Sequence, residues 1–335
     1  MSKPMPSLEE VRSRCSVLKE SLALAGFADR IRTTDNLNTL LGGEATIING
    51  DFRDYAEHIL DFTKRKRDYR FAFYFLDPYG PKAIPLTTVA PIISQKRHDV
   101  MINFPYQDLH KKAGMILKKK LRPVDRQLVH YHTLMFGSNA WIGLVRQIAA
   151  SAHTGERYTD EMEQELVNLY QEVLTNVDDQ LAVKSIRLRF PDKERTMFYL
   201  FLTTHDPNGA LALNEILWEA RLAEHELRWE FRFAKEIAKY RKKGQLSLFD
   251  PFDNGFLTPS PDMPPRPDID VELIAGDILQ TFHSGQVVKF VDILRALADS
   301  PYYFGEIKKA MTRLKRKKRV TYSPRLANNS RVIFN

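Results

Sequence analysis

The chain has 335 residues, 43% of them hydrophobic, which is enough material for a buried core and for two domains. Its formal net charge of +8 is uneven, because residues 301–335 hold ten Lys and Arg against one Glu and carry +9, which leaves −1 for the first 300 residues. A single cysteine, Cys15, excludes a disulfide framework and paired-thiolate metal sites, and no apolar stretch is long enough for a membrane span, so we expect a soluble, cytoplasmic protein without a membrane partner.

The first third of the chain alternates segments of helical and strand-like pattern. In chain order we expect a helix over 7–25, a strand over 45–48, a helix over 55–62, a strand over 71–76, a helix over 83–95 and a strand over 100–104. The run 71–76 is apolar at every position, which predicts a strand buried on both faces. This alternation favours a parallel sheet with crossover helices.

The middle of the chain is mainly helical from 105 to 180. Two apolar runs then follow over 185–190 and 197–203, and the turn-forming residues between them predict an antiparallel hairpin. An amphipathic helix is expected over 209–242. We therefore predict an α/β domain over residues 1–243, with a doubly wound, Rossmann-like sheet and an antiparallel edge hairpin.

The composition changes after this domain. Residues 244–268 contain six prolines and have no helical period, which predicts a linker. The remaining residues, 269–335, predict a separate module. Its expected elements are helices over 269–282, 287–297 and 304–315 and β-strands over 319–322 and 331–334. Three helices followed by a two-stranded hairpin are typical of a winged helix-turn-helix domain.

Polar side chains end the predicted strands. Asp77-Pro78-Tyr79-Gly80 follows the strand 71–76, where the crevice of a parallel sheet binds ligands, and its carboxylate would accept a hydrogen bond or a proton. The same four residues also suit a tight turn. Asp51 ends an earlier strand and suits either a nucleoside contact or an N-terminal cap of the next helix. Asn103 would join the same rim.

The other polar and aromatic candidates have structural interpretations. His205 could cap the helix that begins near Gly209 or have a catalytic part, and capping by Asp206 or Asn208 is weighed at least equally with a catalytic part. His130 and His132 are expected on a helix surface, and Trp141 and Trp218 in the core. The spacing of His and Cys predicts no metal site.

The basic C-terminal module predicts contact with nucleic acid. The helix over 304–315 would lie in the major groove of DNA, with cations on the helix and after it near the phosphates. These expected nucleic-acid-binding residues are Lys308, Arg313, Lys315, Arg316, Lys317, Lys318 and Arg319. The alternative is a protein-interaction winged helix with a solvated basic edge.

Several motifs together resemble one known family. They are Phe75-Leu76-Asp77-Pro78-Tyr79-Gly80, Val100-Met101-Ile102-Asn103-Phe104, Phe136-Gly137 with Trp141, Phe198-Tyr199-Leu200-Phe201, and Thr204-His205 with Gly209 and Trp218. In this order, over residues 7–225, the chain resembles the three-Cys-motif partner protein family (TcmP). The resemblance implies a Rossmann-type, S-adenosylmethionine-dependent methyltransferase-like protein. It also implies a partner protein that carries the three cysteines.

The resemblance assigns roles to the strand-end residues. Asp51 corresponds to the acid near the adenine of the methyl donor, and Asp77, Pro78 and Tyr79 correspond to a catalytic turn that binds a target amine and stacks on a base. Family members begin with a strand and a glycine-rich loop, and this chain has no Gly-x-Gly cluster, so we expect that segment to be absent. The expected function is methyl transfer to nucleic acid. The alternative is a non-catalytic protein that binds nucleic acid or a partner.

Overall fold

The computed structural model describes residues 31–33, 45–47, 51–65, 71–78, 80–117, 122–151, 160–242, 269–323 and 325–335. The predicted helix over 7–25, the predicted linker over 244–268 and the predicted site residue Tyr79 lie outside these ranges. The chain divides into two compact units, Met1–Arg70 and Phe71–Asn335.

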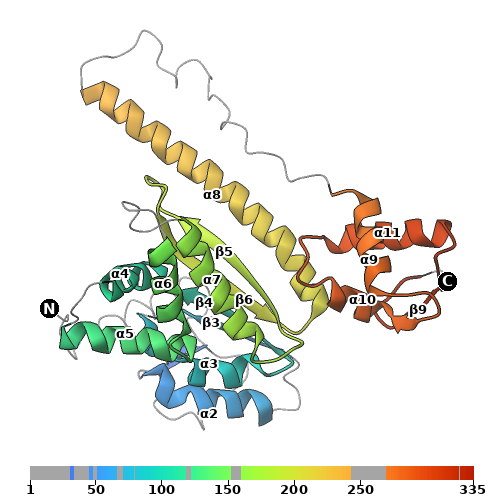
Figure 1. Ribbon diagram of the computed structural model, residues 1–335, viewed down its shortest axis with the longest axis horizontal. Helices are drawn as coiled ribbons and strands as arrows, with labels where there is room; N and C mark the ends of the chain where they lie inside the picture. Colours follow the sequence, from blue (N-terminus) through green and yellow to red (C-terminus); the bar gives the residue numbers. More distant parts are fainter. Residues whose placement is uncertain are drawn as a thin grey trace. The chain divides into compact units, whose positions relative to one another are not determined.

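The first unit contains two short parallel strands and a helix. Strand β1 (Ile31–Thr33) pairs with β2 (Ala45–Ile47). Helix α2 (Phe52–Arg65) follows and is labelled in Figure 1. The helix begins after Asp51, whose Oδ1 accepts a hydrogen bond from the backbone N–H of Arg53 at 3.0 Å. An aspartate in this position satisfies one of the free N–H groups of the first turn, which explains where the helix starts. The predicted strand and helix of this region are confirmed.

The second unit is built on a mixed four-stranded sheet. Its strands are β3 (Ala72–Leu76), β4 (His98–Phe104), β5 (Ala182–Arg189) and β6 (Thr196–Thr204). The order is β3-β4-β6-β5, in which β3 and β4 are parallel and the other two pairings are antiparallel. The predicted hairpin is therefore confirmed, and it extends a two-stranded parallel sheet to give an α/β unit.

One face of this sheet carries the core of the unit. Leu76, Ile102 and Phe201 are in register on three neighbouring strands and are buried. The ring of Tyr170 in α7 packs 5.0 Å from that of Phe201 and 4.5 Å from that of Phe104. The helices between β3 and β5 are α3 (Leu86–Ile93), α4 (Tyr106–Ile116), α5 (Pro123–Phe136), α6 (Ala140–Ser151) and α7 (Asp160–Thr175), preceded by the short 3-10 helix η4 (Pro81–Ala83).

The other face is covered only in part, and the prediction that strand 71–76 is buried on both faces is wrong. Phe73 and Phe75 are each 55% exposed, whereas Tyr74 and Leu76 between them are buried. Successive side chains of a strand point to opposite faces, so the two Phe rings share one face. The long helix α8 (Pro207–Lys242) contacts β5 and β6, at the other side of the sheet, and therefore leaves the edge strand β3 exposed (Figure 1).

Helix α8 links the sheet to the C-terminal part of the chain. Its 36 residues correspond to a length of roughly 54 Å. The side chain of Asp206 caps its first turn, since Oδ1 accepts a hydrogen bond from the backbone N–H of Asn208 at 3.0 Å. None of the helices in the described part of the chain has a stretch long and apolar enough to cross a membrane.

The C-terminal module contains three helices and a small sheet. Its elements are α9 (Val271–Thr281), β7 (Val287–Lys289), α10 (Phe290–Ala296), α11 (Phe304–Arg316), β8 (Val320–Tyr322) and β9 (Arg331–Phe334). The strands are antiparallel in the order β7-β9-β8. A helix over 287–297 was expected, but its first three residues form β7 because they pair with β9. The other predicted elements are confirmed within a few residues.

The module packs directly against the start of α8. Leu211 of α8 is fully buried in the module's own apolar core. Three residues further on, the side-chain amide of Asn214 donates hydrogen bonds to the carbonyl oxygens of Ser300 and Tyr302, at 2.9 and 2.8 Å. The ammonium of Lys184 in β5 also donates to the carbonyl oxygen of Ser300, at 3.2 Å. Apolar burial and hydrogen bonds thus join the module to the sheet.

Candidate functional site

The carboxyl ends of β3 and β4 bring together two predicted site residues. Leu76 is in register with Ile102, so the next residues, Asp77 and Asn103, are neighbours. The side-chain amide of Asn103 donates a hydrogen bond to Oδ1 of Asp77 at 2.7 Å. The prediction that both side chains lie on the rim of parallel strands is confirmed.

The Asp77–Asn103 pair presents hydrogen-bond acceptors. Asp77 is exposed, and Oδ1 of Asn103 is buried without a hydrogen-bond partner among the described residues. The exposed carboxylate of Asp77 can accept a hydrogen bond from an amine or an amide of a ligand, whereas the buried amide oxygen of Asn103 would have to become accessible first. Pro78 is half-buried directly after Asp77 and fixes the direction in which the chain leaves the strand.

Asp51 has a structural role in the first unit. Its Oδ1 also accepts a hydrogen bond from Nε of Arg53 at 3.0 Å, and its Oδ2 lies 2.5 Å from a guanidinium nitrogen of the same residue. Both oxygens are therefore engaged, as expected for the helix-cap interpretation. These three contacts occupy both acceptor sites of Oδ1 and one of the two on the exposed Oδ2. The expected shared site of Asp51 and Asp77 stays a prediction, because the two residues belong to different units.

Two histidines that the sequence singled out have buried side chains. His132 was expected on a helix surface, but its side chain is fully buried, and its Nδ1 lies 2.9 Å from the carbonyl oxygen of Leu128. Burial lowers the pKa of His132. His205 does not cap α8, and its Nε2 lies 3.3 Å from Oδ2 of Asp178. Among the described residues, no group of three or more His, Cys, Asp or Glu is placed to hold a metal ion.

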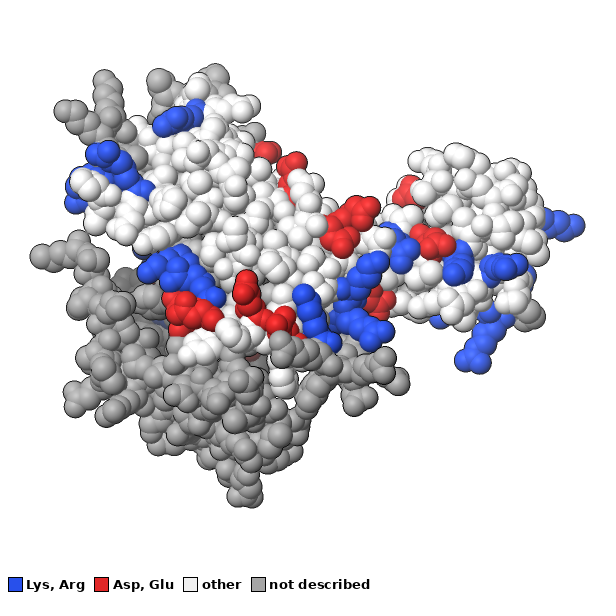
Figure 2. All heavy atoms as spheres, turned by 90° about the horizontal axis from the view of Figure 1, so that it is seen from below, with Lys and Arg blue, Asp and Glu red and all other residues white. Residues whose placement is uncertain are grey.

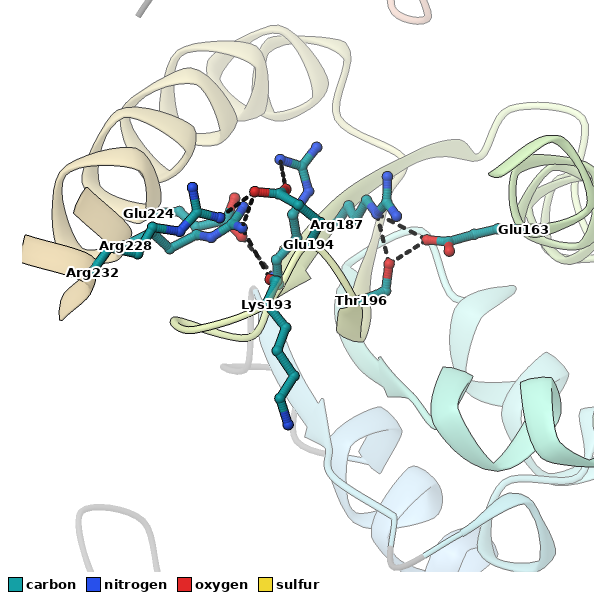
Figure 3. Close-up of polar contacts among 9 residues, drawn as sticks. Glu163, Arg187, Lys193, Glu194, Thr196, Glu224, Arg228 and Arg232 are labelled. Carbon is teal, nitrogen blue, oxygen red and sulfur yellow. Dashed lines mark hydrogen bonds and ion pairs between the residues drawn. The ribbon is translucent and has the colours of Figure 1, made fainter. Parts of the chain in front are cut away.

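A buried carboxylate joins the hairpin to the helices beside it. The oxygens of Glu163 in α7 accept hydrogen bonds from the hydroxyl groups of Tyr106, at 2.9 Å, Tyr199, at 2.7 Å, and Thr196. Nε of Arg187 lies 2.9 Å from the same carboxylate (Figure 3). Arg187 neutralises the charge of Glu163, and the three hydroxyl groups occupy its oxygens. We therefore interpret this cluster as a structural contact between the hairpin and the helices.

A second ionic cluster holds the tip of the hairpin against α8. Glu194, between β5 and β6, pairs with Arg228 at 2.9 Å and with Arg232 (Figure 3). Hydrogen bonds from Arg232 and Arg228 lower the pKa of Glu194 to about 2. Glu224 of α8 also accepts a hydrogen bond from the backbone N–H of Arg189 at 2.6 Å. A guanidinium nitrogen of Arg189 also lies 3.7 Å from Glu194, so the two carboxylates of this cluster face three arginines.

The C-terminal module differs, because several of its cations have no carboxylate partner among the described residues. Figure 2 shows Lys and Arg side chains over the module, at the right of the view, with few acidic ones among them. Four residues on the outer face of α11 are exposed and follow helical spacing, namely Gly305, Lys309, Thr312 and Arg316. In the described residues no carboxylate lies within ion-pair distance of Lys309 or Arg316. The outer face of α11 is thus cationic and free of large apolar side chains.

The structure divides the predicted nucleic-acid-binding cations into two groups. The first group has intramolecular partners. Arg313 and Lys317 each lie 2.6 Å from the carboxylate of Glu272. Lys315 donates to the carbonyl oxygen of Tyr322 at 2.9 Å, and the ammonium of Lys308 lies 4.3 Å from the centre of the Phe304 ring. Lys317, and then Arg313, lower the pKa of Glu272 by hydrogen bonding. The second group consists of the cations whose side chains have no such partner among the described residues, namely Arg316, Lys318 and Arg319, all exposed.

Sequence reasoning missed Lys309 and Thr312 as members of the face. The period of the helix would have found them, because both lie on the same side of α11 as Arg316, seven and four residues earlier. A groove of about 350 Å³ runs beside them, lined by Lys308, Arg313 and Val271 as well as by face residues. The predicted candidate sites that the described residues form are thus the cationic face of α11 and the Asp77–Asn103 pair.

Comparisons with known proteins give this chain no relatives. No family model, no curated protein and no solved structure matches it.

Proposed function

We propose that this chain binds nucleic acid, preferentially duplex DNA, through its C-terminal module acting as a winged helix. The observation that carries the proposal is the outer face of α11, on which Lys309 and Arg316 are exposed without carboxylate partners in the described residues. Side chains on the outer face of such a helix reach the floor and walls of the major groove. Thr312 between the two cations is short enough for the helix to approach closely.

The cations after α11 extend the proposed contact to the phosphate backbone. Lys318 and Arg319 lie in the turn between α11 and β8, and Lys318 adopts a left-handed backbone conformation with φ of 56°. This turn leads the chain away from the helix axis. Phosphate contacts from such a turn would fix the orientation of the helix without reading sequence.

The competing interpretation is a surface that binds an acidic protein. It would use the same cations, but exposed large apolar side chains usually anchor a protein interface. On the described part of α11, every large apolar side chain is buried or half-buried in the module, including Ile307, Met311 and Leu314. A polar, cationic outer face fits a polyanion better.

A binding assay with charge-reversed protein tests the proposal. Fluorescence anisotropy of a labelled random-sequence DNA duplex is measured with the wild-type chain and with the double variant Lys309→Glu and Arg316→Glu. We expect the variant to lose most of its affinity, because two attractive phosphate contacts become repulsive. Parallel titrations with single-stranded DNA and with duplex RNA identify the preferred nucleic acid.

The matched control reverses two exposed cations elsewhere in the second unit. Arg126 of α5 and Arg146 of α6 are exposed and have no carboxylate partner among the described residues, so Arg126→Glu with Arg146→Glu changes the net charge equally. We expect this control to keep most of the affinity. Equal loss in both double variants would show that only net charge matters and would reject the α11 face.

A second candidate function rests on the Asp77–Asn103 pair. We propose that these side chains receive the amino group of a substrate for methyl transfer, with S-adenosylmethionine as donor. The pair supports this because it places an exposed carboxylate at the carboxyl ends of parallel strands, beside a buried amide oxygen that has no hydrogen-bond partner among the described residues. A three-cysteine protein as partner stays a prediction.

Calorimetric titration with S-adenosylmethionine tests the donor part of this candidate. Binding by the wild-type chain, followed by methylation of DNA or RNA that is lost in Asp77→Ala, is the expected result. Absence of heat at millimolar donor, in a preparation whose thermal unfolding is cooperative, rejects methyl transfer by this chain alone. That outcome would leave the nucleic-acid proposal unaffected, because the two sites share no residues.

A further inference from the structure

A cavity of about 570 Å³ lies where β5 and α8 meet the C-terminal module. Its size falls within the range of sites that hold small molecules. Lys184 of β5 and the α8 residues Leu217, Trp218 and Arg221 line one side. Residues 299–303, between α10 and α11, and Leu273 of α9 line the other. A ligand here would touch the sheet, the long helix and the module at once.

The cavity has a positive lining. Arg221 is exposed at its wall, and among the described residues no carboxylate is within ion-pair distance of this guanidinium. The ammonium of Lys184 donates to the carbonyl oxygen of Ser300 and faces Asp299, which opposes the lowering of its pKa by burial. Since Asp299 offsets Lys184, the net charge of the lining corresponds to one cation, and Arg221 is the group available to a ligand.

The cavity also has an aromatic and apolar wall. Trp218 was expected in the core, but it is only half-buried and its side chain lines the cavity. Leu273, on the facing wall, is 57% exposed. A half-buried Trp near an unpaired Arg can stack on a planar ring while the guanidinium binds an anionic group of the same molecule.

We propose that this cavity binds a small ligand that combines a planar aromatic ring with an anionic group. Trp218 and Leu273 would hold the ring, and Arg221 would bind the anion. Two sources share this chemistry, namely nucleoside monophosphates and aromatic carboxylates. The proposal goes beyond nucleic-acid binding and does not depend on it, because the cavity shares no residue with the outer face of α11.

Fluorescence and calorimetric titrations of the full chain test the proposal. The ligands are the common ribonucleoside monophosphates in one arm and benzoate, anthranilate and indole-3-acetate in the other. Adenosine supplies a ring without an anion, and inorganic phosphate an anion without a ring. We expect a member of one arm to bind at least about tenfold more tightly than adenosine and phosphate, because only such a ligand uses both walls.

Variants locate the binding site. Arg221→Gln should weaken binding about tenfold, which is typical for the loss of one charge-assisted contact. Trp218→Phe should remove the ligand-dependent change in fluorescence, since neither of the other two tryptophans, Trp141 and Trp229, lines the cavity. The control Arg126→Gln removes an exposed cation outside the cavity and should bind normally.

Two results would overturn the proposal. One is that no member of either arm binds more tightly than adenosine or phosphate, in protein whose cooperative unfolding shows that it is folded. The other is binding that survives in Arg221→Gln but is lost in Lys309→Gln with Arg316→Gln, which would place the anion on the outer face of α11. Binding by nucleotides or by carboxylates supports the proposal and identifies the source.

Discussion

The side-chain amide of Asn103 donates a hydrogen bond to the carboxylate of Asp77 at 2.7 Å, across the ends of two neighbouring parallel strands. The contact follows from the register, in which Leu76 lies opposite Ile102. It fixes the orientation of the Asn103 amide, because the donor must face Asp77 and the oxygen must point away. The sheet thereby holds a carboxylate and an acceptor oxygen in one place.

Replacing this amide by a carboxylate should make the stability depend on pH. In Asn103→Asp, two carboxyl groups would lie within hydrogen-bond distance, which raises the pKa of one of them above that in the unfolded chain. A raised pKa in the folded state means that stability is lost as the pH rises through it. We expect a loss of about 1–2 kcal/mol at neutral pH and little loss near pH 4, measured by urea denaturation.

The control for this substitution is Asn329→Asp in the exposed turn before β9. It adds the same charge at a position that no carboxylate of the described residues contacts. Its unfolding midpoint should follow that of the wild type at both pH values. Parallel curves for Asn103→Asp and the wild type would show that the two strand-end side chains do not share this contact in solution.

The buried carboxylate of Glu163 should be important for stability. It receives three hydroxyl groups and pairs with Arg187, so Glu163→Gln turns an ionic acceptor into a neutral group and leaves Arg187 without its carboxylate. We expect a loss of about 2–4 kcal/mol in the free energy of unfolding. Glu165→Gln, at an exposed position of the same helix, should cost less than about 0.5 kcal/mol in the same urea titration.

The attachment of the module depends on Leu211. This side chain is fully buried in the module core although it belongs to α8, so Leu211→Ala leaves a cavity between them. We expect a cost of about 2–5 kcal/mol, measured by chemical denaturation. Leu227→Ala makes the same change at a position of α8 that is 64% exposed, and it should be nearly neutral. Similar costs for the two variants would contradict the packing of the module on α8.

The pairing of Glu194 with two arginines should make the stability of the protein depend on pH in the acid range. A carboxyl group with a lowered pKa in the folded state stabilises the protein above its unfolded pKa and loses this effect as the pH falls. For Glu194 this loss occurs over the pH window between its ordinary pKa of 4.5 and its lowered pKa of about 2. The side chain is 69% exposed, so solvent screening keeps the effect small. The thermal midpoint of Glu194→Gln should fall less over this window than that of the wild type.

A control separates this pair from general acid unfolding. Glu226→Gln removes an exposed carboxylate of α8 that has no described ion-pair partner. Its acid transition should match the wild type. If the acid transition of Glu194→Gln matched those of the wild type and of Glu226→Gln, the result would show that the arginines do not bind Glu194 in solution.

Local sequence pattern predicted most of the secondary structure. It did not predict which strands of the sheet are covered by a second layer. The period of α11 and the turn between β5 and β6 depend on nearby residues only, and both were predicted. The burial of strand 71–76 was not, because an apolar run does not show whether a second layer covers it. Phe73 and Phe75 are exposed because α8 packs on β5 and β6 instead of on β3.

The candidate sites show the same limit. Adjacency of Asp77 and Asn103 could be predicted, since both end parallel strands. The ion pairs of Arg313 and Lys317 with Glu272 could not, because Glu272 belongs to another helix about 40 residues earlier. His132 was placed on a surface because its buried neighbours come from other elements. The cavity beside Trp218 also depends on the packing of the module and has no signature in sequence.

The salt dependence of DNA binding tests the central proposal most directly. The logarithm of the association constant is measured against the logarithm of salt concentration for the wild type and for Lys309→Gln with Arg316→Gln. Each lost phosphate contact should reduce the slope by about one, so we expect a slope about two smaller, while Arg126→Gln with Arg146→Gln keeps the wild-type slope. An unchanged slope in the α11 variant, or no binding by the wild type at low salt, would contradict nucleic-acid binding by this face.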